Sequence, residues 1–270
     1  MKNLRFPFIL AVSIALLTLL SLRYFGTASA EPRSIADTSE RTPVLVELFT
    51  SEGCSDCPPA DALLEKLDRS QPVRNAELIV LSEHVDYWDD IGWKDPYSSH
   101  EFSVRQGDYA HRFRLDGAYT PQMVVDGEAQ LVGSDERRAI QVTESAAKAE
   151  KVLVALSSIH LEGNTLAVHI ESSPLTSSAW PKSANVLLVL ADDSDQSNVR
   201  RGENAGRTLK HVAVVRKLTE VGTIDRGGTF SRDVTVSTET ANLRNLRIVA
   251  IVQEMAAGRI LGVGSARLSN

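Results

Sequence analysis

Two patterns of hydrophobic and polar residues divide the chain after residue 42. Up to about residue 151, short apolar runs alternate with longer segments in which apolar residues gather on one side of a helical repeat. The runs are typical of buried strands and the longer segments of amphipathic helices. The predicted order is strand, helix, strand, helix, strand, strand, helix, at about 43–49, 54–69, 77–81, 99–112, 122–127, 129–132 and 134–151.

After residue 151 no segment has a convincing helical pattern. Seven short stretches instead alternate or run apolar, with turn residues such as Gly163-Asn164 between them. They lie at about 152–159, 165–171, 185–191, 210–218, 229–236, 246–254 and 259–268. A series of short strands of this kind is typical of a β-sandwich. We therefore predict an α/β unit at 43–151, with an insertion at about 83–119, followed by an all-β, sandwich-like unit at 152–270.

Composition and charge exclude several classes of protein. The 270 residues are 43% hydrophobic and 24% charged, as in a folded soluble domain. Only 2 cysteines are present, which excludes a disulfide-rich scaffold and a zinc ribbon built from two cysteine pairs. The formal net charge of −6 argues against nucleic acid as a partner. Acidic residues are concentrated in 31–151, whereas 152–270 is nearly balanced, and this difference also favours two units.

The first 30 residues have the layout of a secretory signal. Lys2 and Arg5 precede an uncharged apolar run at 6–22, and the segment ends in Ala-Ser-Ala at 28–30. An uncleaved membrane anchor is the alternative, because the run approaches the length of a membrane-spanning helix. In both interpretations the positive residues stay inside and the body of the chain lies outside the cytoplasm. We expect a periplasmic or secreted protein whose flexible leader occupies 31–42.

The sharpest chemical signal is Cys54-Ser55-Asp56-Cys57, a Cys-x-x-Cys pair where a buried strand turns into a helix. At a helix N-terminus we expect Cys54 to face unpaired backbone N–H groups and the positive end of the helix dipole, which stabilise a thiolate. Cys57, one turn later, is placed to resolve a mixed disulfide. A structural disulfide or two buried thiols are the alternatives, although so short a loop gains little stability from a disulfide. Glu52 and Asp56 oppose thiolate formation, which indicates a reducing or isomerising pair.

Thr120-Pro121 is the second element of interest, because a proline directly before a strand indicates a special bend. Together with the Cys-x-x-Cys pair at the start of a helix, it resembles the thioredoxin superfamily. Proteins of that superfamily have a cis-proline loop before the third core strand, and this loop packs against the active-site cysteines. The resemblance implies a cis Thr120–Pro121 bond and a role for both residues in holding an extended substrate. An ordinary trans proline that opens a strand is the alternative.

Longer motifs narrow the resemblance. They are Glu-Leu-Phe-Thr-Ser-Glu-Gly-Cys-Ser-Asp-Cys-Pro-Pro-Ala-Asp at 47–61, His-Val-Asp-Tyr-Trp-Asp at 84–89, Gly-Trp-Lys-Asp-Pro at 92–96, Tyr-Thr-Pro-Gln at 119–122, and Arg-Gly-Glu-Asn-Ala-Gly-Arg-Thr-Leu-Lys-His at 201–211. These stretches resemble a family of secreted bacterial proteins known as domain of unknown function 1223. The resemblance covers most of the chain after the signal. It implies a thioredoxin-like core with a β-rich extension, and it implies no assigned reaction.

Three further groups are candidates for the site. His84 follows the second predicted strand, where it is either a proton shuttle or metal ligand near the cysteines, or a hydrogen-bonded histidine in a loop. Asp86, Trp88 and Trp93 belong to an acidic, aromatic segment that either lines a cleft for a peptide or sugar, or forms a packed loop with its acids in solvent. The run 201–211 either folds over the first unit and pairs its cations with acidic residues, or is a plain surface loop.

Three classes of function remain. The first is an extracytoplasmic thiol–disulfide oxidoreductase that acts on protein or small-molecule thiols through Cys54 and Cys57 and needs no cofactor. The second is a Cu(I)-binding protein that uses Cys54, Cys57 and His84, because thiolate and imidazole groups suit this ion. Copper chaperones with a thioredoxin-like fold, however, usually space their cysteines one residue wider. The third is a non-catalytic binding module whose β-rich half recognises a partner.

Overall fold

The structure is a computed structural model that describes residues 41–238 and 245–267. The predicted signal or anchor at 1–30 and almost all of the predicted leader lie outside the described residues. The elements in chain order are β1 (Thr42–Thr50), α1 (Pro58–Ser70), β2 (Ala76–His84), α2 (His100–Phe113), β3 (Gln122–Val125), β4 (Ala129–Val132), α3 (Glu136–Ala146), β5 (Val154–Glu162), β6 (Thr165–Ser172), β7 (Ser183–Asn198), β8 (Thr208–Asp225), β9 (Ser231–Ser237), β10 (Leu246–Glu254) and β11 (Ile260–Arg267).

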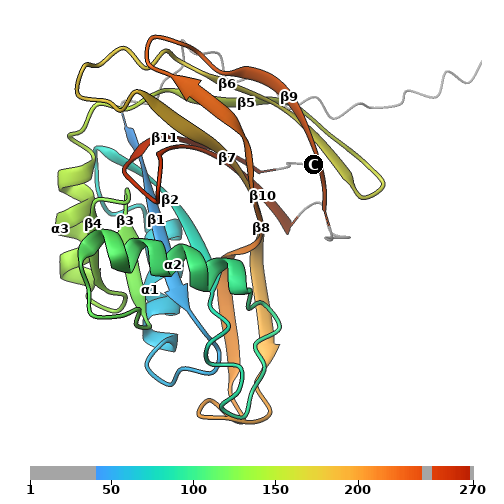
Figure 1. Ribbon diagram of the computed structural model, residues 1–270. Helices are drawn as coiled ribbons and strands as arrows, with labels where there is room; N and C mark the ends of the chain where they lie inside the picture. Colours follow the sequence, from blue (N-terminus) through green and yellow to red (C-terminus); the bar gives the residue numbers. More distant parts are fainter. Residues whose placement is uncertain (1–40, 239–244, 268–270) are drawn as a thin grey trace, which may run out of the picture.

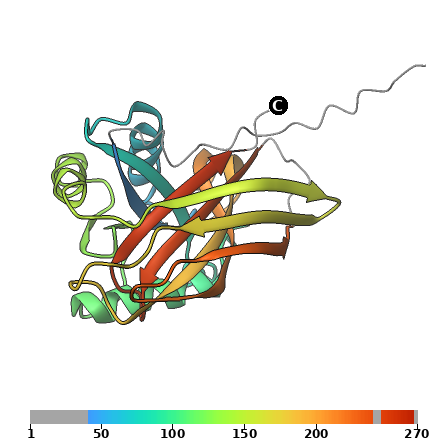
Figure 2. The ribbon, with the colours of Figure 1, turned by 90° about the horizontal axis from the view of Figure 1, so that it is seen from above.

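These strands form two sheets. The large sheet has eight strands in the order β11-β10-β7-β8-β2-β1-β3-β4, and the small antiparallel sheet has the order β5-β6-β9 (Figures 1 and 2). The large sheet is mixed, because β1 pairs with β2 and β2 with β8 in parallel while the other pairs are antiparallel. Since β8 from the second half of the chain pairs with β2 from the first, the predicted boundary at residue 151 does not separate two sheets.

Helices cover both faces of the first half of the large sheet. Alternate residues of a strand face opposite sides of a sheet, and β1 follows this rule. Val44, Val46 and Leu48 pack against α1 and α3 on one face. Leu45 and Phe49 belong to clusters that include side chains of α2 on the other face. All five β1 side chains are completely buried, which agrees with the continuous apolar run that predicted a buried strand.

The second half of the sheet is buried on both faces as well. One face of β7 and β10 packs against the small sheet, which lies above them in Figure 1. The other face contributes Leu187 and Val189 to a cluster that also contains Leu45 of β1 and Ile79 of β2. The two halves of the chain therefore share a hydrophobic core.

Two differences from the predicted elements position the site. The first helix begins at Pro58 rather than at about residue 54, with Cys57 as its N-cap, because proline is favoured at the first helical position. β7 and β8 are 16 and 18 residues long, about twice the predicted length. Their hairpin therefore extends beyond the core, and its loop at 199–207 reaches the segment that follows β2 (Figure 1).

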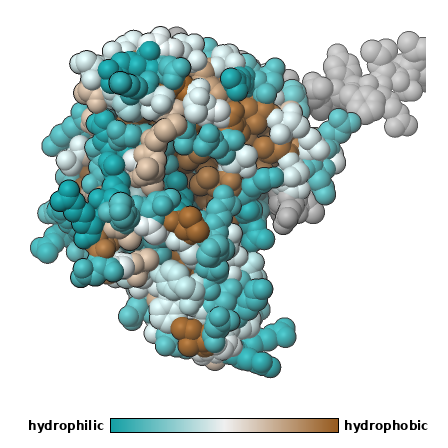
Figure 3. Space-filling view, in the orientation of Figure 1, coloured by the Kyte–Doolittle hydropathy of each residue, from teal (hydrophilic) through white to brown (hydrophobic). Residues whose placement is uncertain are grey.

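The surface gives little sign of an apolar docking face on the side shown in Figure 3. That face is largely hydrophilic, with small, separate apolar patches. Large hydrophobic side chains that are exposed include Tyr87, Ile91 and Val104. No helix in the described parts of the chain is long and apolar enough to cross a membrane.

Candidate functional site

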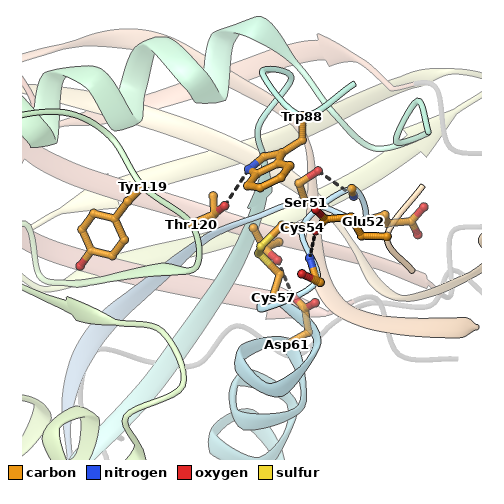
Figure 4. The surroundings of a disulfide bond; sticks show 12 residues. Ser51, Glu52, Cys54, Cys57, Asp61, Trp88, Tyr119 and Thr120 are labelled. Atoms are coloured by element: carbon orange, nitrogen blue, oxygen red, sulfur yellow. Dashed lines mark hydrogen bonds between the residues drawn. A yellow bond between two sulfur atoms is a disulfide. The ribbon is translucent and has the colours of Figure 1, made fainter. Parts of the chain in front are cut away.

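Cys54 and Cys57 lie in the turn between β1 and α1 and form a disulfide (Figure 4). Backbone hydrogen bonds build this turn: the N–H of Cys54 donates to the carbonyl of Ser51 at 3.2 Å, and the N–H of Cys57 donates to the carbonyl of Cys54 at 3.3 Å. Cys54 is 2% exposed and Cys57 is fully buried. The pair therefore stands at the predicted strand-to-helix junction, although Cys54 precedes the first helical turn.

The N-terminus of α1 offers few backbone N–H groups to a Cys54 thiolate. Pro58 and Pro59 occupy the first two helical positions and have no N–H. The N–H groups of Ala60 and Asp61 donate to the carbonyl of Cys57 at 2.8 and 3.1 Å. The prediction of unpaired N–H groups facing Cys54 is wrong at these positions, because two prolines and the tight turn remove the donors.

A cis peptide bond joins Thr120 and Pro121, as predicted. The Thr120 hydroxyl accepts a hydrogen bond from Nε1 of Trp88 at 2.8 Å. Figure 4 shows the Trp88 indole on one side of the disulfide and Asp61 on the other. Trp88 also lies against Gly53, where an added Cβ would be only 3.0 Å from the Cβ of Trp88. Trp88 therefore covers the turn that carries the cysteines.

The loop at 199–207 covers the same turn from the β7–β8 hairpin. Asn204 is completely buried, and its Nδ2 donates to the carbonyl oxygens of Glu52 and Cys54, each at 2.9 Å. Its Oδ1 accepts from Arg207 at 2.7 Å, and the Ser55 N–H donates to a carboxylate oxygen of Glu203 at 3.0 Å. The run at 201–211 thus folds over the first half of the chain, as one of its two interpretations predicted. Its contacts with this region come from the Asn204 amide, the Glu203 carboxylate and the His211 ring, which lies 3.2 Å from the Glu52 carboxylate.

Asn204→Ala is expected to uncover the disulfide. The substitution removes the Asn204 donor from the buried carbonyl of Glu52 and leaves the carbonyl of Cys54 with the Cys57 N–H, which costs about 1–3 kcal/mol of folding stability. We expect a lower urea midpoint and a faster reaction of the disulfide with tris(2-carboxyethyl)phosphine, followed by mass spectrometry after alkylation. Asn198→Ala, at the end of β7, is the matched control because its side chain bonds only Thr208 among the described contacts. Equal reduction rates in the wild type and Asn204→Ala would contradict a covering role.

Glu52 is a fully buried carboxylate at the centre of a polar cluster behind the turn. Its side chain accepts hydrogen bonds from Nε1 of Trp93 at 2.8 Å, from the Ser197 hydroxyl, and from Nε2 of His211 at 3.2 Å. Its N–H donates to Asp95 at 2.8 Å. Trp93, a predicted cleft residue, therefore has its indole N–H directed to a buried carboxylate.

His84 lies in this cluster, at the end of β2. It is completely buried, and its Nδ1 is 2.7 Å from Oδ2 of Asp95. Burial by itself raises the pKa of Asp95, but the charge and hydrogen bond of His84 and two backbone N–H donors lower this pKa to about 2. The His84 ring also contacts the ring of His211, with centroids 4.6 Å apart. His84 is thus a paired histidine inside the fold, next to the cysteine turn.

His211 connects the β-rich half to the cysteine turn. Its Nδ1 is 3.8 Å from Oδ2 of Asp61, whose other oxygen accepts from the Thr50 hydroxyl at 2.9 Å. Burial disfavours the charged ring, but hydrogen bonds and charges of Asp61 and Glu52 outweigh it and raise the pKa of His211 to about 10. The pairing of His211 with Asp61 and Glu52 therefore contributes its full stabilisation of the fold at pH values below 6.5, the ordinary pKa of histidine. This contribution is lost as the pH rises towards 10.

The remaining candidate, Asp86, connects the loop after β2 to α2. Its carboxylate accepts from the Ser103 hydroxyl at 2.5 Å and faces Nδ1 of His100 at 3.1 Å. The Ser103 hydrogen bond is the main cause of the lowered pKa of Asp86. Among the described residues, no three His, Cys, Asp or Glu side chains are arranged to hold a metal ion.

Comparison with known proteins places the chain in a family. Residues 45–253 match the family described as "Protein of unknown function (DUF1223)". The chain belongs to the DUF1223 family. No curated protein matches it.

Two solved structures share the fold of this DUF1223 protein. Protein AGR_C_4864 from Agrobacterium tumefaciens is 24% identical, with a TM-score of 0.65 over 86% of this chain and 100% of that one. HBP35 of Porphyromonas gingivalis is 15% identical, with a TM-score of 0.61 over 85% of this chain and 76% of that one. At these identities the likeness extends to the fold alone.

Sequence reasoning missed several residues of the site. Asn204, Glu203 and Ser197 belong to the β7–β8 hairpin, and their contacts with the cysteine turn span about 150 positions of sequence. The family motif at 201–211 contains two of them and was the available signal. Asp61, four residues after Cys57 on an otherwise amphipathic helix, is a buried acid at a position where an apolar residue would suit the core.

Proposed function

We propose that this protein is an extracytoplasmic thiol–disulfide oxidoreductase in which Cys54 and Cys57 form the redox pair. The observation that carries the proposal is the Cys54–Cys57 disulfide in the turn between β1 and α1. The extracytoplasmic location rests on the sequence of residues 1–30. Protein or small-molecule thiols are the substrates that this chemistry requires.

The arrangement of the first half supports a thioredoxin-like active site. Four neighbouring strands have the order β2-β1-β3-β4, with β1 and β2 parallel and β3 and β4 antiparallel to their neighbours. α1 and α3 cover one face and α2 the other. This strand order and this placement of the helices support the proposal of a thioredoxin-like unit. The small sheet packs on β7 and β10, and this packing supports the sandwich-like arrangement that we propose for the second half of the chain.

The proposed reaction is a pair of exchanges at sulfur. In the reducing direction, the Cys54 thiolate attacks a substrate disulfide, forms a mixed disulfide and releases one substrate thiolate. The Cys57 thiolate then attacks the Cys54 sulfur, forms the Cys54–Cys57 disulfide and releases the second substrate thiolate. Cys54 is the attacking residue in this scheme because it is the less buried of the two. Trp88 and the 199–207 loop have to move to admit a protein substrate.

The scarcity of free N–H donors at α1 favours the reducing or isomerising end of the redox scale. A strong oxidant needs an unusually stable thiolate, and helix N–H groups are a main source of that stability. Here Pro58 and Pro59 have no N–H, and the N–H groups of Ala60 and Asp61 already donate to the carbonyl of Cys57. Few of these donors are therefore left for a Cys54 thiolate. The scarcity of N–H donors in this turn is thus the physical reason for the proposed reducing or isomerising direction.

The proposal is tested by a redox titration of residues 31–270 without metal. The protein is equilibrated in glutathione buffers, alkylated and read by mass spectrometry. We expect one two-electron transition of Cys54 and Cys57, below about −120 mV and nearer −270 mV. The absence of a transition in this range would contradict the proposal. Binding of one Cu(I) by the reduced protein would then support the alternative that uses Cys54, Cys57 and His84.

A further inference from the structure

The Ser55 N–H lies between the two cysteines and is held by a residue from the other half of the chain. It donates to Oε2 of Glu203 at 3.0 Å, across 148 positions of sequence. The N–H groups of Gly53, Cys54 and Cys57 have local acceptors, namely the Ser51 hydroxyl and the carbonyls of Ser51 and Cys54. The Ser55 amide, next to Cys54 in the chain, therefore differs from those of Cys54 and Cys57 because its acceptor comes from outside the turn.

The position of Glu203 is set by its neighbours on the loop. Asn204, the next residue, is buried and bound to the carbonyls of Glu52 and Cys54. Gly202, the preceding residue, has φ of 74° and lies against Trp93, with 3.1 Å between the Cβ of Trp93 and a Cβ added at Gly202. Only a residue without a Cβ fits this conformation and contact without strain. The Glu203 carboxylate is thus brought to Ser55 by contacts on both sides of it.

Reduction changes what the Ser55 N–H can bind. When the Cys54–Cys57 bond breaks, Cys54 becomes a thiol or thiolate that competes for nearby donors, and a thiolate is the stronger competitor. The Glu203 carboxylate already accepts from Ser55 and adds negative charge beside the turn. The occupied Ser55 N–H and the added negative charge both disfavour the Cys54 thiolate, whereas they affect the neutral disulfide less.

We infer that Glu203 sets the redox balance of the cysteine pair by competing with the Cys54 thiolate for the Ser55 N–H, and that it favours the disulfide. The inference rests on the proposed function and makes Glu203 a positioning residue that acts through the Ser55 amide. Removing the carboxylate then frees the Ser55 N–H or leaves it a weaker acceptor, which stabilises the reduced form and makes the protein more oxidising.

The experiment compares the wild type, Glu203→Gln, Glu203→Ala and a control in glutathione buffers at pH 7. Two glutathione thiols supply two electrons and two protons, the Cys54–Cys57 bond breaks, and glutathione disulfide forms. Glu203→Gln keeps an oxygen acceptor for Ser55 but removes the charge, whereas Glu203→Ala removes both. Glu220→Gln is the matched control, because Glu220 is an exposed carboxylate of β8 in the part of the strand that pairs with Leu187.

We expect the equilibrium constant for reduction to rise about two- to fivefold in Glu203→Gln and at least as much in Glu203→Ala, the size of other charge effects at helix N-termini. Glu220→Gln should match the wild type. The measurement is an equilibrium, so easier access to the disulfide in a variant changes the rate but not the result. Wild-type constants in both Glu203 variants would overturn the inference while leaving the proposed function intact. A wild type without any two-electron transition would overturn both.

Discussion

Cys54→Ser is expected to abolish thiol–disulfide exchange, while Cys57→Ser is expected to stop the reaction at a mixed disulfide. The reason is the order of attack: Cys54 forms the bond to the substrate, and Cys57 releases it. The rate with a peptide disulfide should fall to that of the reagents without protein in both variants. Only Cys57→Ser should give a covalent adduct, whose mass equals protein plus one substrate half and which dithiothreitol removes.

Each variant is the control for the other, because each loses one buried sulfur from the same turn. Circular dichroism of both variants establishes that the fold is kept. An adduct on Cys54→Ser rather than on Cys57→Ser would reverse the assigned roles. Full exchange activity in both would show that the exchange does not need this cysteine pair and would contradict the proposed function.

Arg105→Met is expected to lower the free energy of unfolding by about 3–5 kcal/mol, because it leaves buried carboxylates without their cation. Nε of Arg105 on α2 donates to Glu47 of β1 at 2.8 Å and lies 3.6 Å from Glu83 of β2. Both glutamate side chains are fully buried. Burial, and to a lesser degree the nearby Glu47, raises the pKa of Glu83 well above its ordinary value, although Arg105 lowers it.

Urea unfolding at pH 7 measures this effect. Arg137→Met, an exposed position on α3, is the control and should change stability by less than about 0.5 kcal/mol. Adding Glu47→Gln to Arg105→Met removes one of the unpaired charges and should recover part of the loss. A loss below about 1 kcal/mol in Arg105→Met would mean that water or another group compensates the carboxylates.

The helices and strands were largely predictable because the burial of a helix or strand produces a periodic pattern of apolar residues in the sequence. The strand predicted at 246–254 is β10, Leu246–Glu254, and the hairpin partner predicted at 129–132 is β4. The cis Thr120–Pro121 bond followed from the resemblance of the chain to thioredoxin-like proteins, and the structure confirms it. The start of α1 was misplaced because it was put at the cysteine pair, whereas Pro58 and Pro59 decide where the helix begins.

The chemistry around the cysteines was less predictable because it depends on contacts between distant segments. Nothing in the local pattern of 185–191 or 210–218 shows that β7 and β8 continue as a long hairpin to 198 and from 208, since the outer part of β7 at 192–198 is polar at every position. This extension brings Glu203, Asn204 and His211 to the cysteine turn. His84 pairs instead with Asp95, eleven positions further along the chain, in the segment that follows β2.

The amino-acid sequence alone predicts the alternation of strands and helices, the junction that holds Cys54 and Cys57, and membership of a family through its motifs. These features depend on side-chain periodicity, turn residues and short spacings, all of which act over a few residues. The pairing of β8 with β2, the core shared by the two halves and the contact of Glu203 with Ser55 become visible in the folded chain alone. Apolar patterning shows that a strand is buried without specifying its neighbour, and that choice depends on the packing of the whole chain.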